Sequence, residues 1–199
     1  MNKKSLLLLV LLMCYESVAV ARTLYALPLT KHPGRYGGWF DHDSLTDKTK
    51  RYDCLTGIAY DKHKGTDFPV AVGTSVHTGA EGVIYKVEAN CPNGPKSGRN
   101  TNNRSCGSSF GNHVRIKHAD GNISIYAHLS QIWQPTPTNA NCSYYIGQSG
   151  NSGASDGPHL HFELRSSDTG TSLDPFGGSC SGSTYWVNQN NGFPMMTCQ

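Results

Sequence analysis

The feature that most constrains the fold is a strictly alternating stretch at residues 157–165. Its apolar side chains are Leu160, Phe162 and Leu164. Alternation with a period of two residues is typical of a β-strand that turns one face to a hydrophobic core. We therefore predict a strand over residues 159–164. On its polar face His159 and His161 would stand roughly 6.5–7 Å apart, either as a solvated surface pair or as part of a site.

The rest of the chain after Ile58 also reads as β-structure. Short apolar runs alternate with turns rich in glycine, proline and asparagine, and no window holds a sustained helical period. The predicted strands cover residues 70–72, 82–87, 113–117, 123–128 and 159–164. Residues 120–122 (Asp-Gly-Asn) predict a hairpin turn. In the strand after that turn, Tyr126 and His128 would share one face and Ala127 would lie on the other. We expect a mostly β fold.

The first residues have the composition of a secretory signal. Lys3 and Lys4 precede an apolar run at residues 6–13, and small residues at 19 and 21 predict cleavage before Arg22. The apolar run is too short to cross a bilayer. We therefore expect a secreted protein, extracellular or periplasmic.

Removal of residues 1–21 leaves 178 residues, enough for one domain with a hydrophobic core. We divide them into an N-terminal arm, residues 22–57, and a domain, residues 58–199. The remaining 15 basic and 13 acidic residues give too small a net charge to indicate nucleic acid as a partner. We expect a monomer without membrane attachment. A lipoprotein signal at Cys14 is the alternative, but Met13 stands where a small residue is expected.

Six cysteines follow the predicted signal, an even number that is typical of disulfides in an exported protein. No Cys-x-x-Cys occurs, which disfavours zinc ligation by cysteine. A polar loop at residues 90–107 lies between two of the cysteines and would be closed by its own disulfide. The expected pairs are Cys91–Cys106, Cys180–Cys198 and Cys54–Cys142.

Histidine and aspartate side chains at distant places in the sequence indicate a metal site. His63 and Asp67 are four residues apart, in a segment where Gly65 and Pro69 favour extended or irregular backbone. Both side-chain types suit Zn²⁺, and catalytic zinc commonly has three protein ligands and one position for water. One more ligand is needed, and we take His161.

Two histidines then remain beside the metal rather than on it. Peptide hydrolysis needs a group that moves a proton and one that stabilises the oxyanion, and His128 and His159 can fill both roles near neutral pH. The sequence lacks a His-Glu-x-x-His motif with its glutamate base. Tyr126, on the predicted face of His128, could contribute a hydroxyl donor.

Three segments in a fixed order carry a family resemblance: HKGTDF at residues 63–68, GNHVRIKHADGNISIYAHLS at 111–130, and IGQSGNSGASDGPHLHFEL at 146–164. Together they resemble the lysostaphin-like and β-lytic peptidoglycan zinc endopeptidases. The resemblance implies an antiparallel β domain with an open substrate groove and zinc at its floor. It also implies cleavage of peptide bonds in peptidoglycan cross-links or stem peptides.

Matched position by position, the resemblance implies that His63, Asp67 and His161 bind zinc and that His128 and His159 are catalytic. None of the five is replaced, which favours an enzyme over the main alternative, a secreted non-catalytic zinc-binding module of the same fold. A serine protease centred on residues 150–153 is a weaker alternative, because glycine and serine equally suit a polar turn. An inhibitory role for the N-terminal arm is a further hypothesis.

Overall fold

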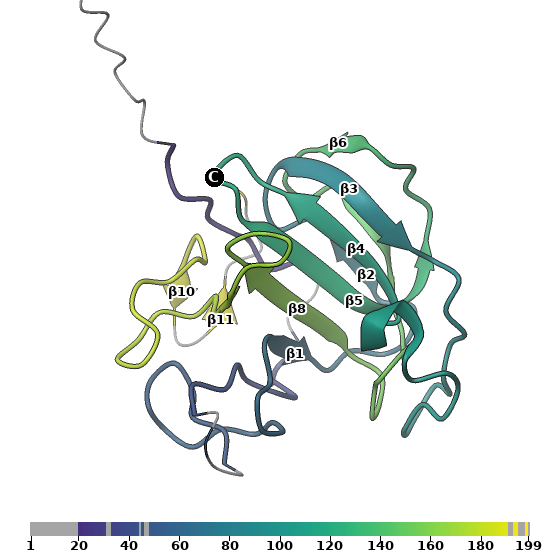
Figure 1. Cartoon of the computed structure of the whole chain (residues 1–199), viewed down its shortest axis with the longest axis horizontal. Coiled ribbons are helices and arrows are strands. Elements are labelled where there is room, and N and C mark those ends of the chain that lie inside the picture. The colour runs from purple at the N-terminus through teal and green to yellow at the C-terminus, as the bar shows by residue number, and fades with distance from the viewer. Residues whose placement is uncertain are drawn as a thin grey trace, which may run out of the picture.

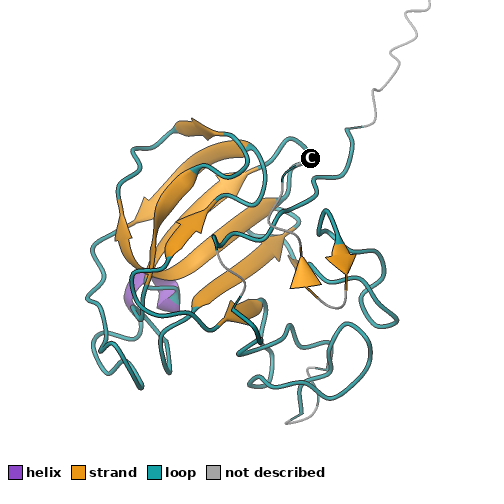
Figure 2. Cartoon of the chain, turned by 180° about the vertical axis from the view of Figure 1, so that it is seen from behind, coloured by secondary structure: helices purple, strands orange, loops and turns teal. Residues whose placement is uncertain are grey.

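The computed structural model describes residues 20–30, 33–43, 45, 48–190, 193–194 and 198. The predicted export signal therefore lies almost wholly outside the described residues. In chain order the elements are β1 (Thr66–Phe68), β2 (Ser75–His77), β3 (Gly82–Glu88), the short 3₁₀ turn η1 (Cys106–Ser109), β4 (Asn112–Lys117), β5 (Ile123–Ile132), β6 (Thr138–Ala140), β7 (Tyr145–Ser149), β8 (Leu160–Arg165), β9 (Ser172–Leu173), β10 (Gln189–Asn190) and β11 (Phe193–Pro194). The predicted mostly β fold is confirmed, and Figure 2 shows strands surrounded by long loops.

Within the described ranges, nine strands form one antiparallel sheet (Figure 1). Its main path runs β1-β8-β5-β4-β3-β6, while β7 pairs with β2 and with β5, and β9 pairs with β8. The predicted hairpin turn connects β4 to β5, with Gly121 at a φ of +86° that glycine adopts without steric cost. Because β1, β8 and β5 are neighbours, side chains on one face of these three strands meet.

The prediction of a strand at residues 70–72 is wrong. Residues 70–72 form a loop and the start of a turn between β1 and β2. Pro69 cannot donate a ladder hydrogen bond, and Gly73 has a φ of +93°, so the chain bends here instead of continuing β1. The apolar run that suggested a strand is therefore split between loop and turn.

The core lies on the face of β8 that the alternation predicted. Leu160, Phe162 and Leu164 are fully buried and pack with the side chains of β1 to β5, and Trp186 closes this core from the C-terminal segment. Each buried side chain of this size contributes about 1.5–3 kcal/mol. The polar face of β8 is also covered, since His161 is 5% exposed and Glu163 is 1% exposed. The strand is thus buried on both faces.

Three disulfides cross-link the described part of the chain, and one of the expected pairs is confirmed, Cys91–Cys106. The other two expected pairs are wrong, because the bonds join Cys54 to Cys180 and Cys142 to Cys198. The turn that carries Cys180 packs on the arm, where the Cys180 N–H donates to the Tyr52 carbonyl at 2.8 Å. This contact places Cys180 beside Cys54.

A search of the described residues for membrane-spanning segments found no helix with the length and apolar character that a bilayer crossing needs.

Candidate metal centre

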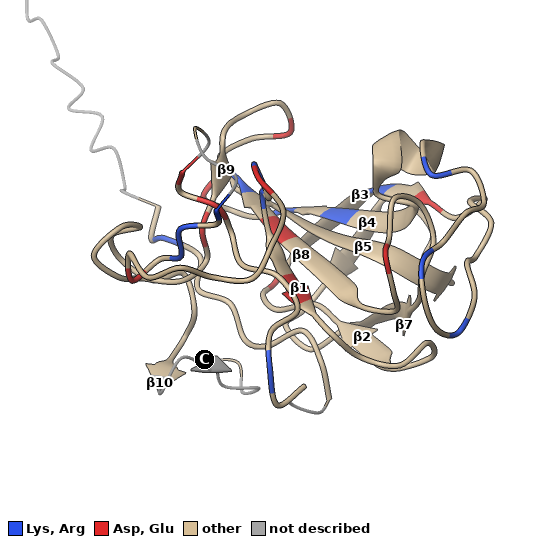
Figure 3. Ribbon diagram, turned by 90° about the horizontal axis from the view of Figure 1, so that it is seen from below, with Lys and Arg blue, Asp and Glu red and all other residues tan. Residues whose placement is uncertain are grey.

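The pairing of β1 with β8 sets two of the predicted site residues opposite each other. Asp67 is the register partner of His161, so the two side chains project from neighbouring positions on the same face of the sheet. Figure 3 shows acidic positions in both strands at this place. His63 comes from the loop before β1 and is almost fully buried. The sheet therefore brings together residues that are 94 positions apart in the sequence.

The three side chains converge on one point. His161 Nδ1 lies 2.9 Å from Asp67 Oδ1, His63 Nε2 lies 3.2 Å from His161 Nδ1, and His63 Nε2 lies 3.3 Å from Asp67 Oδ1. Three ligands at 2.0–2.1 Å from a tetrahedral ion would be roughly 3.3–3.4 Å apart. The triangle has nearly this size, so the donor set fits one metal ion.

The second nitrogen of each of these two histidine rings also has a partner. His63 Nδ1 lies 2.7 Å from the Trp39 carbonyl oxygen, and His161 Nε2 lies 3.4 Å from Glu163 Oε2. Glu163 in turn accepts hydrogen bonds from Arg165 Nε at 2.6 Å and from the Ser172 hydroxyl at 2.9 Å. Such outer contacts fix ring orientation and leave the other nitrogen free to face an ion.

The backbone at His128 is unusual. Its φ of +59° lies in the left-handed region, which costs a non-glycine residue about 1–3 kcal/mol. The register of β5 with β4 and with β7 also shifts next to this position. Simple alternation would turn His128 toward the core with Tyr126, but the irregular backbone turns its ring toward His161, with ring centroids 5.8 Å apart.

The prediction that Tyr126 shares the face of His128 is therefore wrong. Tyr126 is fully buried in the core, and its hydroxyl accepts a hydrogen bond from the Gly79 N–H at 2.9 Å. It contributes to packing and not to the site.

His128 and His159 stand beside the triangle, with their ring centroids 4.6 Å apart. Each ring is anchored through Nδ1 on a backbone carbonyl, that of Ser152 for His128 and that of Gly157 for His159, both at 2.7 Å. An Nδ1–H donor leaves Nε2 as a proton acceptor. His159 Nε2 lies 3.5 Å from Asp67 Oδ1, so the His159 ring lies next to the donor triangle.

A second grouping, His128, His159 and His161, also brings its nitrogens within 4.8 Å of one another. The two groupings share His161, so the five predicted site residues form one cluster. Only the grouping with Asp67 offers a carboxylate, whose charge offsets part of the charge of a divalent ion. The geometry and the charge both favour that triangle as the metal-binding set.

The electrostatics of the cluster favour a cation. Burial alone would raise the pKa of Asp67, but the neighbouring histidine rings hold it well below its ordinary value. Burial would lower the pKa of His161, but hydrogen bonds to Asp67 and Glu163 raise it to about 9. The two carboxylates thus favour a positive charge on the His161 ring, which lies between them. Burial lowers the pKa of His128 well below its usual range, so that ring is neutral at pH 7.

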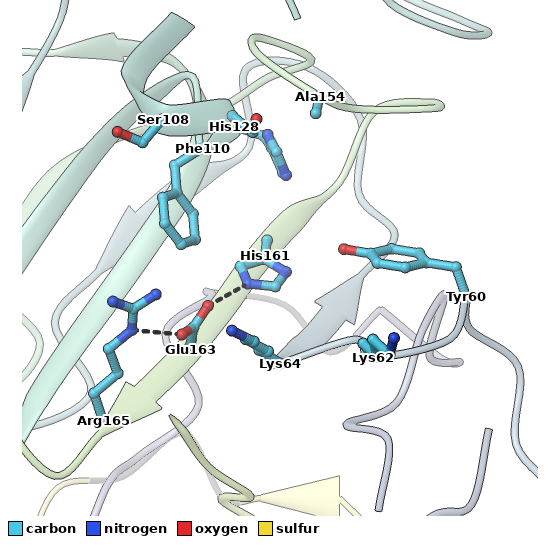
Figure 4. A pocket seen from close by; sticks show the side chains of 11 residues that line it. Tyr60, Lys62, Lys64, Ser108, Phe110, His128, Ala154, His161, Glu163 and Arg165 are labelled. Carbon is cyan, nitrogen blue, oxygen red and sulfur yellow. Dashed lines mark hydrogen bonds and ion pairs between the residues drawn. The ribbon is translucent and has the colours of Figure 1, made fainter. Parts of the chain in front are cut away.

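Two hollows flank the cluster and share Tyr60, His128, Ala154 and His161. The first has a volume of about 290 Å³ and carries charged side chains (Figure 4). These are Lys62, Lys64, Glu163 and Arg165. The second, about 400 Å³, is lined by Gly37 of the arm, by Ile58 and Ala59 just after it, and by the loop before His159. Together they form an open groove across the centre.

Three parts of the site were missed by the sequence reasoning. Tyr60, which extends over the groove toward His161 in Figure 4, lies in an irregular loop without a periodic signal. The Trp39 carbonyl is a backbone group, which no side-chain motif reports. Glu163 could have been found, since it stands two residues after His161 on the same face of a predicted strand.

Comparison with known proteins agrees with this geometry. The family model "Peptidase family M23" matches residues 61–175, more than half of the chain. The peptidoglycan DD-endopeptidase ShyA of Vibrio cholerae is 35% identical over 102 residues, which are 51% of this chain and 20% of ShyA. The DD-carboxypeptidase/endopeptidase Mpg of Neisseria meningitidis is 38% identical over 104 residues, 52% of this chain and 20% of Mpg.

The matched segment is thus about a fifth of the length of these relatives. A crystal structure of a zinc-containing peptidase from Vibrio cholerae has 23% sequence identity and a TM-score of 0.50, with 72% of this chain and 37% of that chain covered. That likeness shows a shared fold. The family match spans all five clustered side chains, and this chain therefore belongs to peptidase family M23.

Proposed function

We propose that this protein is a secreted zinc metalloendopeptidase that hydrolyses peptide bonds of bacterial peptidoglycan. The observation that carries the proposal is the donor triangle of His63, Asp67 and His161 with two anchored imidazoles beside it. Membership of a peptidase family and the names of the two relatives support the same activity. Action on the wall requires export, which the signal predicted at residues 1–21 would provide.

Zinc is the metal that the donor set suits best. Two imidazole nitrogens and one carboxylate oxygen in a tetrahedral arrangement are typical of catalytic zinc, and a fourth position stays open. When bound, zinc would polarise the substrate carbonyl and lower the pKa of water toward ~7. His63, Asp67 and His161 would hold it, and the outer contacts to Trp39 and Glu163 would keep both rings in place.

The chain's own proton-transfer groups are His128 and His159. With Nδ1 bound to a carbonyl, each ring presents Nε2 to the reacting atoms, so one ring can take the proton of the attacking water. Once protonated, that ring can deliver the proton to the leaving amine. The pair together would stabilise the negative charge that develops on the carbonyl oxygen.

The charged side chains of the groove indicate what kind of substrate it binds. In the first hollow Glu163 is already neutralised by Arg165, while Lys62 and Lys64 have no carboxylate partner among the described residues. Two free ammonium groups favour an anionic ligand. Stem peptides carry free carboxylates and glycine bridges do not, so we infer that the protein cleaves between stem peptides, as the DD-endopeptidase names of relatives also suggest.

The test is digestion of purified peptidoglycan. Wild-type protein should release soluble peptide fragments with new termini, identified by mass spectrometry. A chelator should stop the release and added zinc should restore it. Walls cross-linked directly between stem peptides should be cut faster than walls with glycine bridges. A zinc-loaded protein that binds peptidoglycan but releases no fragment would refute the enzyme and favour the non-catalytic binding module.

A further inference from the structure

The N-terminal arm runs along the open edge of β1, next to the donor triangle. The Gly37 N–H donates to the Asp67 carbonyl and the Asp67 N–H donates to the Gly38 carbonyl, both at 2.9 Å. Gly38 and Asp67 also form an isolated antiparallel bridge. The Asp41 N–H continues the contact by donating to the His63 carbonyl at 2.8 Å. Residues 37–41, here called the arm segment, thus touch the backbone of two of the three donor residues.

The arm segment also contacts the side chains of the same two residues. The Trp39 carbonyl lies 2.7 Å from His63 Nδ1, and this bond sets the rotation of the His63 ring. Gly38 lies against the triangle itself. A Cβ atom placed on Gly38 would lie 2.7 Å from Asp67 Oδ2 and 3.1 Å from His63 Cε1, and real Cβ atoms essentially never come as close as the first of these distances.

The neighbouring glycine offers a contrast. A Cβ atom on Gly37 would meet the Asp67 Cβ and Pro69 at 3.6 Å, which is ordinary van der Waals contact. Neither Gly37 nor Gly38 has a positive φ, so alanine fits the backbone conformation at both positions. The space beside Asp67 and His63 therefore admits a Cβ atom at position 37 but not at position 38, so of the two glycines only Gly38 must lack a side chain.

Several links hold the arm segment in this place. The Asp41 carboxylate accepts three backbone N–H bonds, from Asp43 at 2.9 Å and from Lys50 and Lys62 at 3.0 Å. The third donor, Lys62, directly precedes His63. His42 Nε2 lies 2.8 Å from Asp174 Oδ2. With these bonds at Asp41 and at the next residue, His42, the arm segment is a fixed part of the domain.

We propose that the arm segment is a structural component of the metal centre, in which Gly38 and the Trp39 carbonyl act as positioning groups for Asp67 and His63. This inference rests on the proposed function only in that the triangle binds the metal. This role differs from the hypothesis of an inhibitory arm. Removal of an inhibitor raises activity, whereas loss of a positioning segment weakens metal binding.

The experiment compares Gly38→Ala with Gly37→Ala in the full-length chain after its normal processing. Zinc affinity is measured by competition with a chromophoric chelator, and the absorption spectrum of the Co²⁺-substituted protein reports the coordination geometry. Gly38→Ala should weaken zinc binding by about 10- to 100-fold, the usual effect of disturbing outer contacts, and should alter the Co²⁺ spectrum. Gly37→Ala should keep both properties of the wild type.

A variant at Asp41 gives an independent measurement if Gly38→Ala does not fold. Asp41 has no atom in the donor triangle, yet Asp41→Ala should also lower zinc affinity, because the arm segment loses three anchoring bonds. The proposal is overturned if Gly38→Ala or Asp41→Ala binds zinc as tightly as the wild type. It is also overturned if Gly38→Ala and Gly37→Ala lose the same amount of zinc affinity. A wild-type protein that binds no zinc would instead refute the proposed function, so the two failures are distinct.

Discussion

Replacement of His128 by asparagine separates metal binding from proton transfer. Asparagine tolerates the left-handed backbone that His128 adopts, and its amide can still donate to the Ser152 carbonyl. The fold should therefore be kept, with a change in the free energy of unfolding within about 1 kcal/mol. Because His128 lies outside the donor triangle, zinc content and zinc affinity should stay close to those of the wild type.

Turnover should fall sharply in His128→Asn. An amide cannot accept and return a proton, and general acid–base catalysis contributes about 10²- to 10⁴-fold. This corresponds to about 2.7–5.4 kcal/mol of lost transition-state stabilisation. The assay combines initial rates of fragment release from peptidoglycan with zinc content by mass spectrometry on the same sample. A rate within tenfold of the wild type at full zinc content would remove His128 from the mechanism. Loss of zinc would instead assign the metal to the grouping of His128, His159 and His161.

Three further predictions concern the metal, its outer contact and the groove. His161→Ala should lose stoichiometric zinc together with activity; a zinc-loaded His161→Ala variant would show that the ligand is another residue. In metal-free protein, contacts with His161 and Arg165 lower the pKa of Glu163 from 4.5 to about 2, despite a burial cost that acts in the other direction. Glu163 therefore stabilises the fold above pH 4.5, and this contribution, on the order of 2–3 kcal/mol, is lost as the pH falls toward 2. Denaturant unfolding with chelator should show that Glu163→Gln loses less stability over this range; an unchanged acid sensitivity would contradict this. The double substitution Lys62→Ala/Lys64→Ala should lower kcat/KM several-fold for peptides with a free carboxylate, since each exposed charge contributes up to about 1 kcal/mol, and should leave a neutral peptide unaffected. Equal losses for both peptides would refute an anion-binding hollow.

Much of the site followed from sequence because side-chain chemistry and strand period are local signals. The alternation in residues 157–165 indicated the buried face of β8, and it placed His161 with Glu163 on the other face. The spacing of His63 and Asp67 and the order of the three motifs then identified the five side chains that the structure brings together. Their distances from one another depend on long-range pairing, which no local pattern reports.

The failures have physical reasons of the same kind. Period-two alternation assumes a regular strand, so it could not foresee that the backbone at His128 turns the ring away from the face of Tyr126. Proximity in sequence favours Cys180 with Cys198 and leaves Cys54 with Cys142, whereas Cys54 and Cys180 meet because the C-terminal turn packs on the arm. The role of the Trp39 carbonyl depends on a backbone position, which any residue type could supply.

The register of Asp67 opposite His161 also has a consequence for the time at which the protein becomes able to act. A chain that is synthesised from its N-terminus presents His63 and Asp67 long before β8, and two donors alone make a weak metal site. The 94-residue loop between Asp67 and His161 must therefore close before all three donors can bind a metal ion. The complete three-donor metal site would thus form only after β8 has been synthesised and has paired with β1.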